Sequence, residues 1–227
     1  MRIVAREDAG AGLTLVHLEP SVDIHVHYTR PGQVLVVQGE TAGREDAYFA
    51  LASPLASATL ALLVRDAGTV AHRLLTCELG TKFSVLVPSF AGFPHRAGEL
   101  GPFGLVAVGS ALGAVRGLYL AVEAEGRAHE ATLFLGVRGV DHVPLRAELE
   151  RIAFAGSRVV VCVSDEAPSP SLPFEVRGGL VQEGVLAAAK DGTLPRGTVL
   201  YVAGPPRMMD DFRAHEAELG MVVHTNA

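Results

Sequence analysis

Short apolar runs separated by glycine and proline make up most of the first 98 residues. Five of them are rich in β-branched residues or alternate apolar with polar positions: GLTLVHLE, VDIHVHYT, QVLVVQ, TLALLVRD and FSVLVP. This pattern is typical of strands in an antiparallel sheet. Only residues 68–78, GTVAHRLLTCE, have the spacing of a helix. Residues 1–98 are therefore predicted to form an antiparallel β-barrel or sandwich.

The pattern changes near residue 100, and from there apolar strands alternate with helical segments. The predicted strands are LVAV, TLFLGV, RVVVCVS, TVLYVA and MVVHT, and a segment with helical spacing follows each of the first four. Such alternation is typical of a parallel sheet covered by helices. Residues 99–227 are therefore predicted to form a separate α/β domain with a parallel sheet. Within it, residues 164–179 are rich in serine and proline and are predicted to be a long surface loop.

Residues 105–122, LVAVGSALGAVRGLYLAV, have three interpretations: a membrane span, a buried helix, or a strand that turns into a helix. A membrane span is disfavoured because Arg116 near its centre would cost about 3 kcal/mol in a bilayer. A turn at Gly109 and Ser110 fits the alternation that follows. Small residues there let the backbone approach a ligand, and the free N–H groups of a helix start favour a phosphate. Small residues are equally typical of a turn that only packs a helix on a strand, so both interpretations stay open.

Composition narrows the function classes. The 19 Lys and Arg against 25 Asp and Glu give a net charge of −6, which provides no basic field for nucleic acid. The two cysteines, Cys77 and Cys162, form no CxxC pair, which excludes a cysteine-ligated zinc or iron–sulfur site and argues against a disulfide framework. The N-terminus has no signal-peptide core. We therefore expect a cytoplasmic protein without a membrane span.

Two pairs of side chains have both a structural and a functional interpretation. His25 and His27 alternate along a predicted strand, so both would face one side as a candidate metal-ligand pair. No third ligand follows in a recognisable pattern, and we predict an exposed strand face and no metal site. Met208 and Met209 would suit the lining of a cofactor site, but at helical spacing they are predicted to belong to the core.

Nine motifs occur along the chain in the order and spacing of a known family. They are PGQVLVVQ (31–38), AYFALAS (47–53), GTVAHRLL (68–75), FAGFP (90–94), GSALGAVRG (109–117), LFLGVRGVDHVPLRAELE (133–150), GGLVQEGVL (178–186), AGPPRMM (203–209) and VHTN (223–226). Together they resemble the ferredoxin–NADP reductase-like family of flavin oxidoreductases over essentially the whole chain. The resemblance implies that the barrel is a flavin-binding domain that holds FAD. It also implies that the α/β domain is a nucleotide-binding domain for NADH or NADPH.

The resemblance also implies an activity and a set of cofactor-binding residues. Hydride would pass from the nicotinamide to flavin N5, and electrons would go on to an unknown acceptor. A protein is one candidate for this acceptor. Such chemistry needs no acid–base residue, because the protein supplies orientation. Contiguous alignment places Phe49 on the flavin ring, and a shift of one residue would place Tyr48 there. The implied cofactor-binding residues are Tyr48, Phe49, Ala50, Leu51, Ser53, Gly68, Thr69, Val70, Gly92, Phe93, Gly109, Ser110, Gly113, Arg138, Gly204, Pro205 and Met208.

Several polar groups of the family's motifs are replaced in this chain. The flavin-phosphate arginine falls on Ala47, and the serine near flavin N5 falls on Ala50. Ala71 stands for the serine of the pyrophosphate helix, and Ala203 for the cysteine beside the nicotinamide. Each lost hydrogen bond to a charged group weakens binding by about 1.5–3 kcal/mol. These losses favour an alternative from another class, a non-catalytic binding or assembly subunit that keeps the reductase fold.

Overall fold

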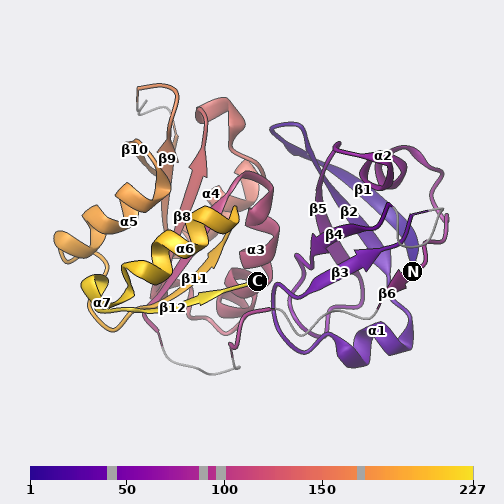
Figure 1. Ribbon diagram of the computed structural model, residues 1–227, viewed down its shortest axis with the longest axis horizontal. Coiled ribbons are helices and arrows are strands. Elements are labelled where there is room, and N and C mark those ends of the chain that lie inside the picture. Colours follow the sequence, from indigo (N-terminus) through magenta and orange to yellow (C-terminus); the bar gives the residue numbers. More distant parts are fainter. Residues whose placement is uncertain (40–44, 87–91, 96–100, 168–171, 227) are drawn as a thin grey trace.

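The computed structural model describes residues 1–39, 45–86, 92–95, 101–167 and 172–226, which form two adjoining halves (Figure 1). The first half contains two antiparallel sheets of three strands each. Their orders are β1 (Arg2–Gly10), β2 (Leu13–Glu19), β5 (Leu60–Arg65) and β4 (Ala47–Ala50), β3 (Val34–Val37), β6 (Val85–Leu86). The predicted antiparallel architecture is thus confirmed. The predicted domain boundary at residues 98 and 99 lies outside the described residues.

One apolar core fills the space between the two antiparallel sheets. An isolated bridge pairs Leu51 with Leu62 and joins the end of β4 to β5. Both leucines are fully buried. Helix α2 (Thr69–Thr76) covers the core through Leu74, where the helical spacing of residues 68–78 predicts a helix.

The predicted strand at residues 22–29 is wrong, because Val22–His27 form the helix α1. The segment alternates apolar with polar residues, but it belongs to neither antiparallel sheet. Of its alternating apolar residues, Ile24 and Tyr28 are buried and Val22 and Val26 are exposed, so burial repeats after four residues, as on one face of a helix. His25 and His27 stand roughly 200° apart around a helix and do not share a face. Across the described ranges, no three His, Cys, Asp or Glu side chains form a group that could hold a metal ion.

The second half is a six-stranded parallel sheet, as predicted from the alternating pattern. Its order is β10-β9-β8-β7-β11-β12. The bounds are β7 (Phe103–Val108), β8 (Ala131–Val137), β9 (Arg158–Val163), β10 (Glu175–Gly178), β11 (Val199–Ala203) and β12 (Val222–Thr225). The chain runs outward from β7 to β10 and then returns to the other side of β7, so the order reverses between β7 and β11.

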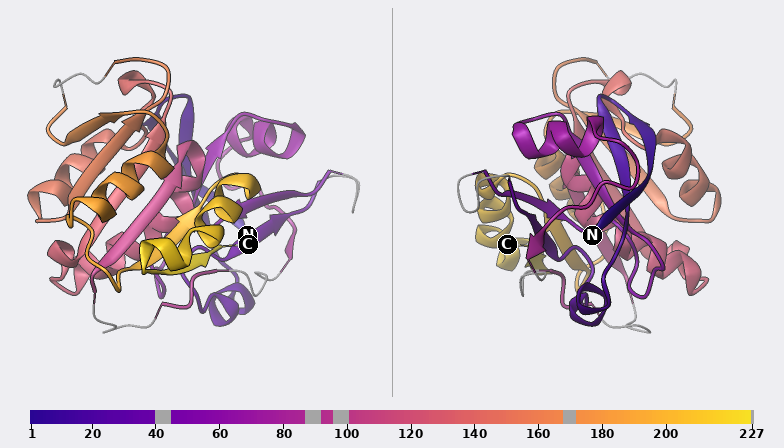
Figure 2. Two further views of the ribbon diagram at one scale, coloured as in Figure 1. Left: turned by 60° about the vertical axis from the view of Figure 1, so that its left-hand side comes forward. Right: turned by 90° about the vertical axis from the view of Figure 1, so that its right-hand side faces the viewer.

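Helices cover both faces of the parallel sheet (Figure 2). One apolar cluster places α3 (Leu112–Ala124) and α4 (Arg146–Phe154) on one face. Another places α5 (Val181–Lys190), α6 (Pro206–Ala214) and α7 (Glu216–Leu219) on the opposite face. Met208 and Met209 are buried in this second cluster, which confirms their predicted place in the core. Three short 3-10 turns, Gly109–Ala111, Ala128–Glu130 and Val140–His142, link strands to helices.

The loop predicted at residues 164–179 contains one further strand. Glu175–Gly178 form β10, which pairs in parallel with β9 at the edge of the sheet. The sequence EVRG has little apolar signal of its own. Strand β10 is held by its backbone pairing with β9 and by an ion pair from Glu175 to Arg158 of β9 at 2.5 Å. Glu175 also pairs at 2.5 Å with Arg177, two residues along the same strand. The contacts with β9 connect distant positions and leave no local pattern.

Residues 105–122 form most of strand β7, a turn and most of helix α3. In the part of the chain that the structure describes, no helix is long and apolar enough to cross a membrane. Gly113 and Gly117 let α3 approach the first half closely. A Cβ atom at Gly113 would lie 3.1 Å from Cβ of Leu63, and one at Gly117 would collide with the carbonyl oxygen of Ser53. The glycines of α3 therefore serve the contact between the two halves.

Arg116, on the same helix, ties three elements together. Its guanidinium makes two hydrogen bonds to the Glu148 carboxylate on α4, at 2.8 and 2.5 Å. A third, at 2.9 Å, reaches the carbonyl oxygen of Ala52 in the first half. The Tyr119 hydroxyl donates to the same carboxylate. The side chains of Arg116 and Glu148 are only 11% and 19% exposed, so this ion pair is largely shielded from water.

The charge states of this network follow from its surroundings. Burial alone would lower the pKa of Arg116, but the hydrogen bonds and charge of Glu148 outweigh it and raise that pKa. Burial, reinforced by the Glu148 charge, raises the pKa of Tyr119 well above its ordinary range. Arg116 thus stays protonated and Tyr119 neutral, and both donate hydrogen bonds to the side chain of Glu148.

We expect Glu148→Gln to lower the free energy of unfolding by about 3 kcal/mol, because it leaves the buried Arg116 without a counter-charge. Urea unfolding followed by circular dichroism measures the change. The matched control is Glu150→Gln on the same helix, whose partner Arg146 is 51% exposed. That change should cost less than about 1 kcal/mol. Equal losses in the two variants would contradict a special role for the network.

Candidate functional site

A large cavity opens at the carboxyl ends of strands β7 to β10, and we call it the edge cavity. It encloses about 690 Å³. The carboxyl edge of an open parallel sheet is where ligands of α/β folds bind. It is lined by Ala11, Arg65, Val108, Gly109, Gly136, Val137, Arg138, Asp141, His142, Cys162, Ser164, Gly179, Leu180, Val181 and Gln182.

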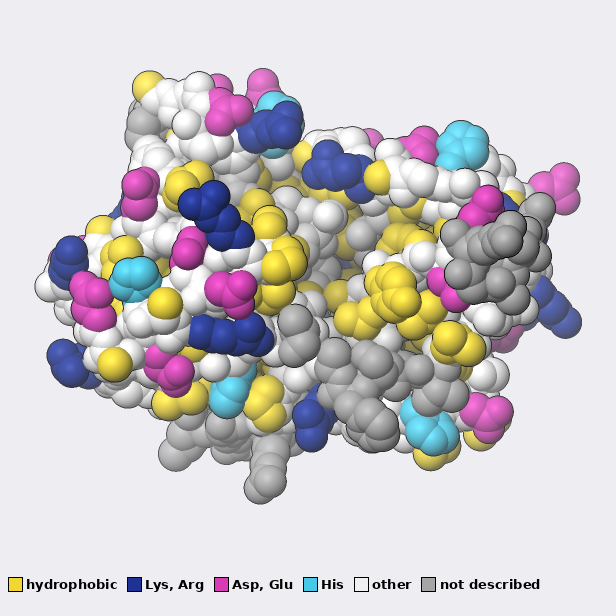
Figure 3. Space-filling model, viewed as in Figure 1, with side chains coloured by type: hydrophobic (Ala, Val, Ile, Leu, Met, Phe, Trp, Pro, Cys, Tyr) yellow, Lys and Arg dark blue, Asp and Glu magenta, His cyan; other side chains and the backbone are white. Residues whose placement is uncertain are grey.

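A second cavity, the junction groove, lies between the two halves beside the reversal point of the sheet. It encloses about 430 Å³. Its lining residues are Val34, Ala47, Tyr48, Phe49, Ala50, Leu63, Arg65, Ala67, Ala71, Ser110, Ala111, Ala114, Gly204 and Asn226. Figure 3 shows the molecule hollowed between its halves, with apolar side chains gathered on the side of β3 and β4. The two cavities share Arg65 and lie on either side of the turn that follows β7.

The turn after β7 brings bare backbone to both cavities. Gly109 has φ of +53°, a left-handed conformation that favours glycine. Gly109 lines the edge cavity and Ser110 lines the junction groove. No side chain caps the short turn or the start of α3 that follows it. The N–H of Leu112, where α3 begins, donates to the carbonyl oxygens of Gly109 and Ser110, so it is the N–H groups of the turn itself that face a negatively charged ligand.

Arg65, at the end of β5, provides a cation where the cavities meet. A Cβ atom on Gly109 would lie 3.7 Å from Nη2 of Arg65, so the guanidinium stands beside the glycine turn. The side chain is exposed, and within the described ranges it makes no ion pair. The motifs quoted above do not include Arg65. The sequence nevertheless held a signal for it: Arg65 ends an apolar strand three residues before Gly68, where a helix is predicted to begin.

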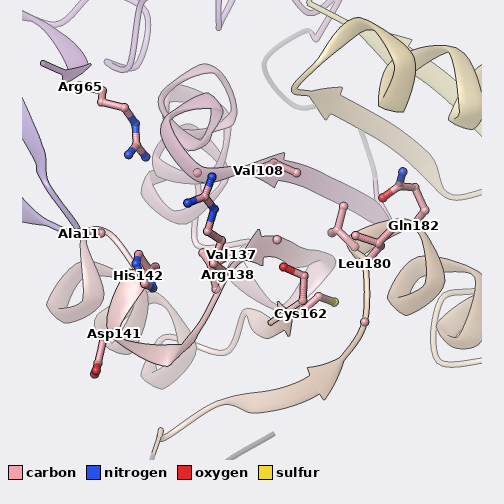
Figure 4. A pocket seen from close by; sticks show the side chains of 15 residues that line it. Ala11, Arg65, Val108, Val137, Arg138, Asp141, His142, Cys162, Leu180 and Gln182 are labelled. Atoms are coloured by element: carbon pink, nitrogen blue, oxygen red, sulfur yellow. The ribbon is translucent and has the colours of Figure 1, made fainter. Parts of the chain in front are cut away.

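Figure 4 shows how charge is distributed in the edge cavity. Arg65, Arg138 and His142 lie toward one side, near Ala11, and the Asp141 carboxylate is on the same side but directed away from them, while Leu180 and Gln182 lie at the other. One part of the cavity is therefore suited to anionic groups. The other part, at the start of α5, is suited to an apolar ring with polar edges.

The tip of the β1–β2 hairpin crosses from the first half to form a wall of the edge cavity. Gly10, Ala11 and Gly12 all have positive φ, which makes the tip a tight turn. The carbonyl oxygen of Ala9 accepts a hydrogen bond from the N–H of Leu145 at 2.6 Å. Through this bond the tip is held against the segment that carries His142. No motif of the sequence indicates this contact.

Cys162 lies on the wall of the edge cavity without being reactive. The residue is only 1% exposed. Burial raises the pKa of its thiol to about 11, and the nearby positive charge of Arg177 offsets part of this effect. The thiol is therefore neutral near pH 7, and Cys162 serves as a small apolar side chain.

Two aromatic residues, consecutive in strand β4, line the junction groove. Tyr48 is 72% exposed. Phe49 is half-buried, pairs with Leu35 across the sheet and packs partly on the core of the first half. Both rings line the groove. The structure thus leaves both candidates for a stacking ring in place.

Seven of the residues implied by the motifs line the two cavities. Tyr48, Phe49, Ala50, Ser110 and Gly204 line the junction groove, and Gly109 and Arg138 line the edge cavity. Four others are engaged in packing or hydrogen bonds within the protein itself. Leu51 is in the core, Ser53 Oγ accepts the N–H of Ala61 at 2.6 Å, Gly113 packs on Leu63, and Phe93 packs edge-on against Tyr201.

The remaining residues of that set are not among the lining residues of either cavity. Thr69 and Val70 line a small separate cavity with Arg73 and Phe83. Gly68 faces open space, and Gly92 packs on Gln33. Pro205 precedes α6, and Met208 is buried with its methyl group against Gly204.

Residues 105–214 match the family model described as the oxidoreductase NAD-binding domain. The whole fold is similar to solved structures of low sequence identity. A cytochrome P450 reductase from Amycolatopsis is 22% identical, with a TM-score of 0.77 over 99% of this chain and 68% of that one. A ferredoxin NADP⁺ reductase from Neisseria gonorrhoeae, solved with FAD and NADP, is 12% identical, with a TM-score of 0.76 over 100% and 97%.

The FAD/NAD binding domain of a nitric oxide dioxygenase from Vibrio cholerae is 16% identical, with a TM-score of 0.76 over 99% of this chain and 96% of that one. No curated protein matches the sequence. The similarities establish a two-domain fold of the ferredoxin–NADP reductase type.

Proposed function

We propose that this chain, which has the ferredoxin–NADP reductase-like fold and whose residues 105–214 match the model of the oxidoreductase NAD-binding domain, is a flavin-dependent NAD(P)H oxidoreductase. One observation carries the proposal. The edge cavity, at the carboxyl ends of the strands, meets the aromatic junction groove at Arg65 and the Gly109 turn. Two planar ligands bound there would come together at that point.

The edge cavity fits a nicotinamide dinucleotide. The turn that begins at Gly109 presents bare N–H groups, and Arg65 and Arg138 add positive charge for the pyrophosphate. The order of the strands gives the direction in which the dinucleotide would lie across the sheet. Adenosine would lie over β9 and β10, near Gln182, and the nicotinamide over β7, beside the groove.

The junction groove fits the ring of a flavin, for which FAD is proposed. Tyr48 or Phe49 would pack on the face of the ring, and Gly204 would let the nicotinamide approach it. When bound, a flavin accepts hydride from the nicotinamide at N5 and passes electrons to an acceptor. The residues of this chain orient the two rings and exclude water from their contact. The proposed acceptor is a small molecule or a protein.

The alternative function is a non-catalytic binding or assembly subunit. The missing polar groups at Ala47, Ala50 and Ala71 support it. The family match and the two adjoining cavities support the oxidoreductase. Cys77 and Cys162 are free thiols, which supports a reducing cytoplasm as the location of the protein.

Gly109→Val should raise the KM for NADH or NADPH at least about tenfold, because a branched side chain enters the path of the dinucleotide. Flavin affinity should change little. The control is Gly126→Val, since Gly126 also has a positive φ, +72°, and open space around it. That variant introduces the same backbone strain away from the cavities. Equal dinucleotide affinity in both variants would make the Gly109 turn a packing device only.

Arg65→Gln should weaken NAD(P)H binding roughly 10- to 150-fold, the effect of one hydrogen bond to a charged group. Added salt should weaken NAD(P)H binding to the parent protein, because it screens the attraction between Arg65 and the ligand. The difference in affinity between the parent protein and Arg65→Gln should therefore shrink at high salt. Isothermal titration of dinucleotide at two salt concentrations measures both effects. Arg2→Gln, at an exposed ion pair with Glu19, is the control and should bind as the parent does.

The proposed function is tested by adding FAD to the purified protein and following the visible flavin band during titration with NADH or NADPH. Bleaching of the band and transfer to an artificial acceptor are expected. Phe49→Leu should bind flavin about 2- to 12-fold more weakly, since it loses only the ring stacking. An effect of Tyr48→Leu instead would move the stacking role by one residue. A protein that binds no flavin and oxidises no dinucleotide would favour the non-catalytic alternative.

A further inference from the structure

The junction groove has a large apolar surface and very little charge. Arg65 is the one charged side chain among its described lining residues. Half of the lining consists of alanine and glycine, namely Ala47, Ala50, Ala67, Ala71, Ala111, Ala114 and Gly204. Such a wall offers area to a flat ring and no side-chain donors to a phosphate.

The start of α2, where a flavin phosphate would lie next to the groove, is also poor in positive charge. Ala47 ends in a methyl group, and Gly68 at the helix start faces open space. Asp66 precedes the helix, and its carboxylate lies 3.1 Å from Nδ1 of His72. A carboxylate at this end neutralises part of the helix dipole and repels a phosphate. Arg73 belongs to a separate cavity, which it shares with Glu45 and Phe83.

Arg65 lines both cavities, and its guanidinium is assigned to the dinucleotide. Nη2 lies beside the Gly109 turn, where the dinucleotide pyrophosphate is proposed to bind. The ring part of a flavin therefore has a binding surface, and the phosphate part has no cation of its own among the described residues.

We propose that the chain recognises flavins by their ring alone, binds riboflavin, FMN and FAD alike, and releases the flavin after reduction. The flavin is then an exchangeable substrate and not a resident cofactor. This inference rests on the proposed function. The nicotinamide gives up a hydride, two electrons with one proton, to flavin N5, and a proton from water completes the dihydroflavin. NAD(P)⁺ and the dihydroflavin leave as products.

Equilibrium dialysis of the full chain against each flavin, without dinucleotide, tests the inference. We expect the three dissociation constants to agree within about threefold, and gel filtration to strip the flavin from the protein. One charged hydrogen bond to a phosphate would separate riboflavin from FMN and FAD by roughly 10- to 150-fold. A preference of that size for FMN or FAD would overturn the inference.

Ala47→Arg supplies the missing cation and gives an independent test. FMN and FAD should bind roughly 10- to 150-fold more tightly to this variant, and riboflavin should bind as to the parent. Arg65→Gln should leave all three flavin affinities unchanged. If Arg65→Gln weakens FMN and FAD but not riboflavin, Arg65 holds the flavin phosphate and the inference is wrong.

Turnover separates this inference from the proposed function. With catalytic protein, NAD(P)H and a large excess of riboflavin, many equivalents of riboflavin should be reduced per chain under anaerobic conditions. Tight FAD that stays bound while an external acceptor is reduced would overturn the exchange and leave the oxidoreductase intact. Failure to bind or reduce any flavin would overturn both.

Discussion

The relation between the two halves of this protein depends on Arg116, whose guanidinium is paired with Glu148 in the second half and donates a hydrogen bond to the carbonyl oxygen of Ala52 in the first. Both cavities depend on that relation, since each takes walls from the antiparallel sheets and from the parallel sheet. The guanidinium spans from α4 to the carbonyl of Ala52. It can do so only because Gly117 lets α3 lie directly on the strand segment. The shielded guanidinium of Arg116 and the absence of a side chain at Gly117 thus both contribute to the contact between the halves.

Glycine and alanine have different structural roles where the two halves meet. Gly113 and Gly117 shorten the distance between helix and strand, so any side chain there would push the halves apart. The alanines of the junction groove instead leave room beside Tyr48 and Phe49. Small residues in a motif are therefore ambiguous in sequence, because close packing and an open ligand site both require them.

Local periodicity predicted the parallel sheet and its helices because each of these elements buries a face of its own. It failed at α1, where apolar alternation suggested a strand but only Ile24 is buried. It also failed at β10, which is held by its pairing with β9 and by the ion pair between Glu175 and Arg158.

The candidate site, too, has parts that local sequence patterns predict and parts that they do not. The Gly109 turn is visible in sequence because strand, turn and helix are consecutive. The wall at Ala11 comes from a hairpin far away in the chain, and the meeting of the two cavities at Arg65 follows from the relative placement of the halves. The motif comparison also assigned Ser53 and Phe93 to a ligand. Their buried partners, Ala61 and Tyr201, become evident only in three dimensions.

The hairpin tip at Ala9 and the Arg116 guanidinium attach the halves at two separated points. Gly113 and Gly117 add close packing on Leu63 and Ser53. A rotation of one half away from the other would have to break these hydrogen bonds and open this packing. Ligands would enter and leave through the open rim of a preformed site, and exchange would be limited by desolvation and side-chain motion.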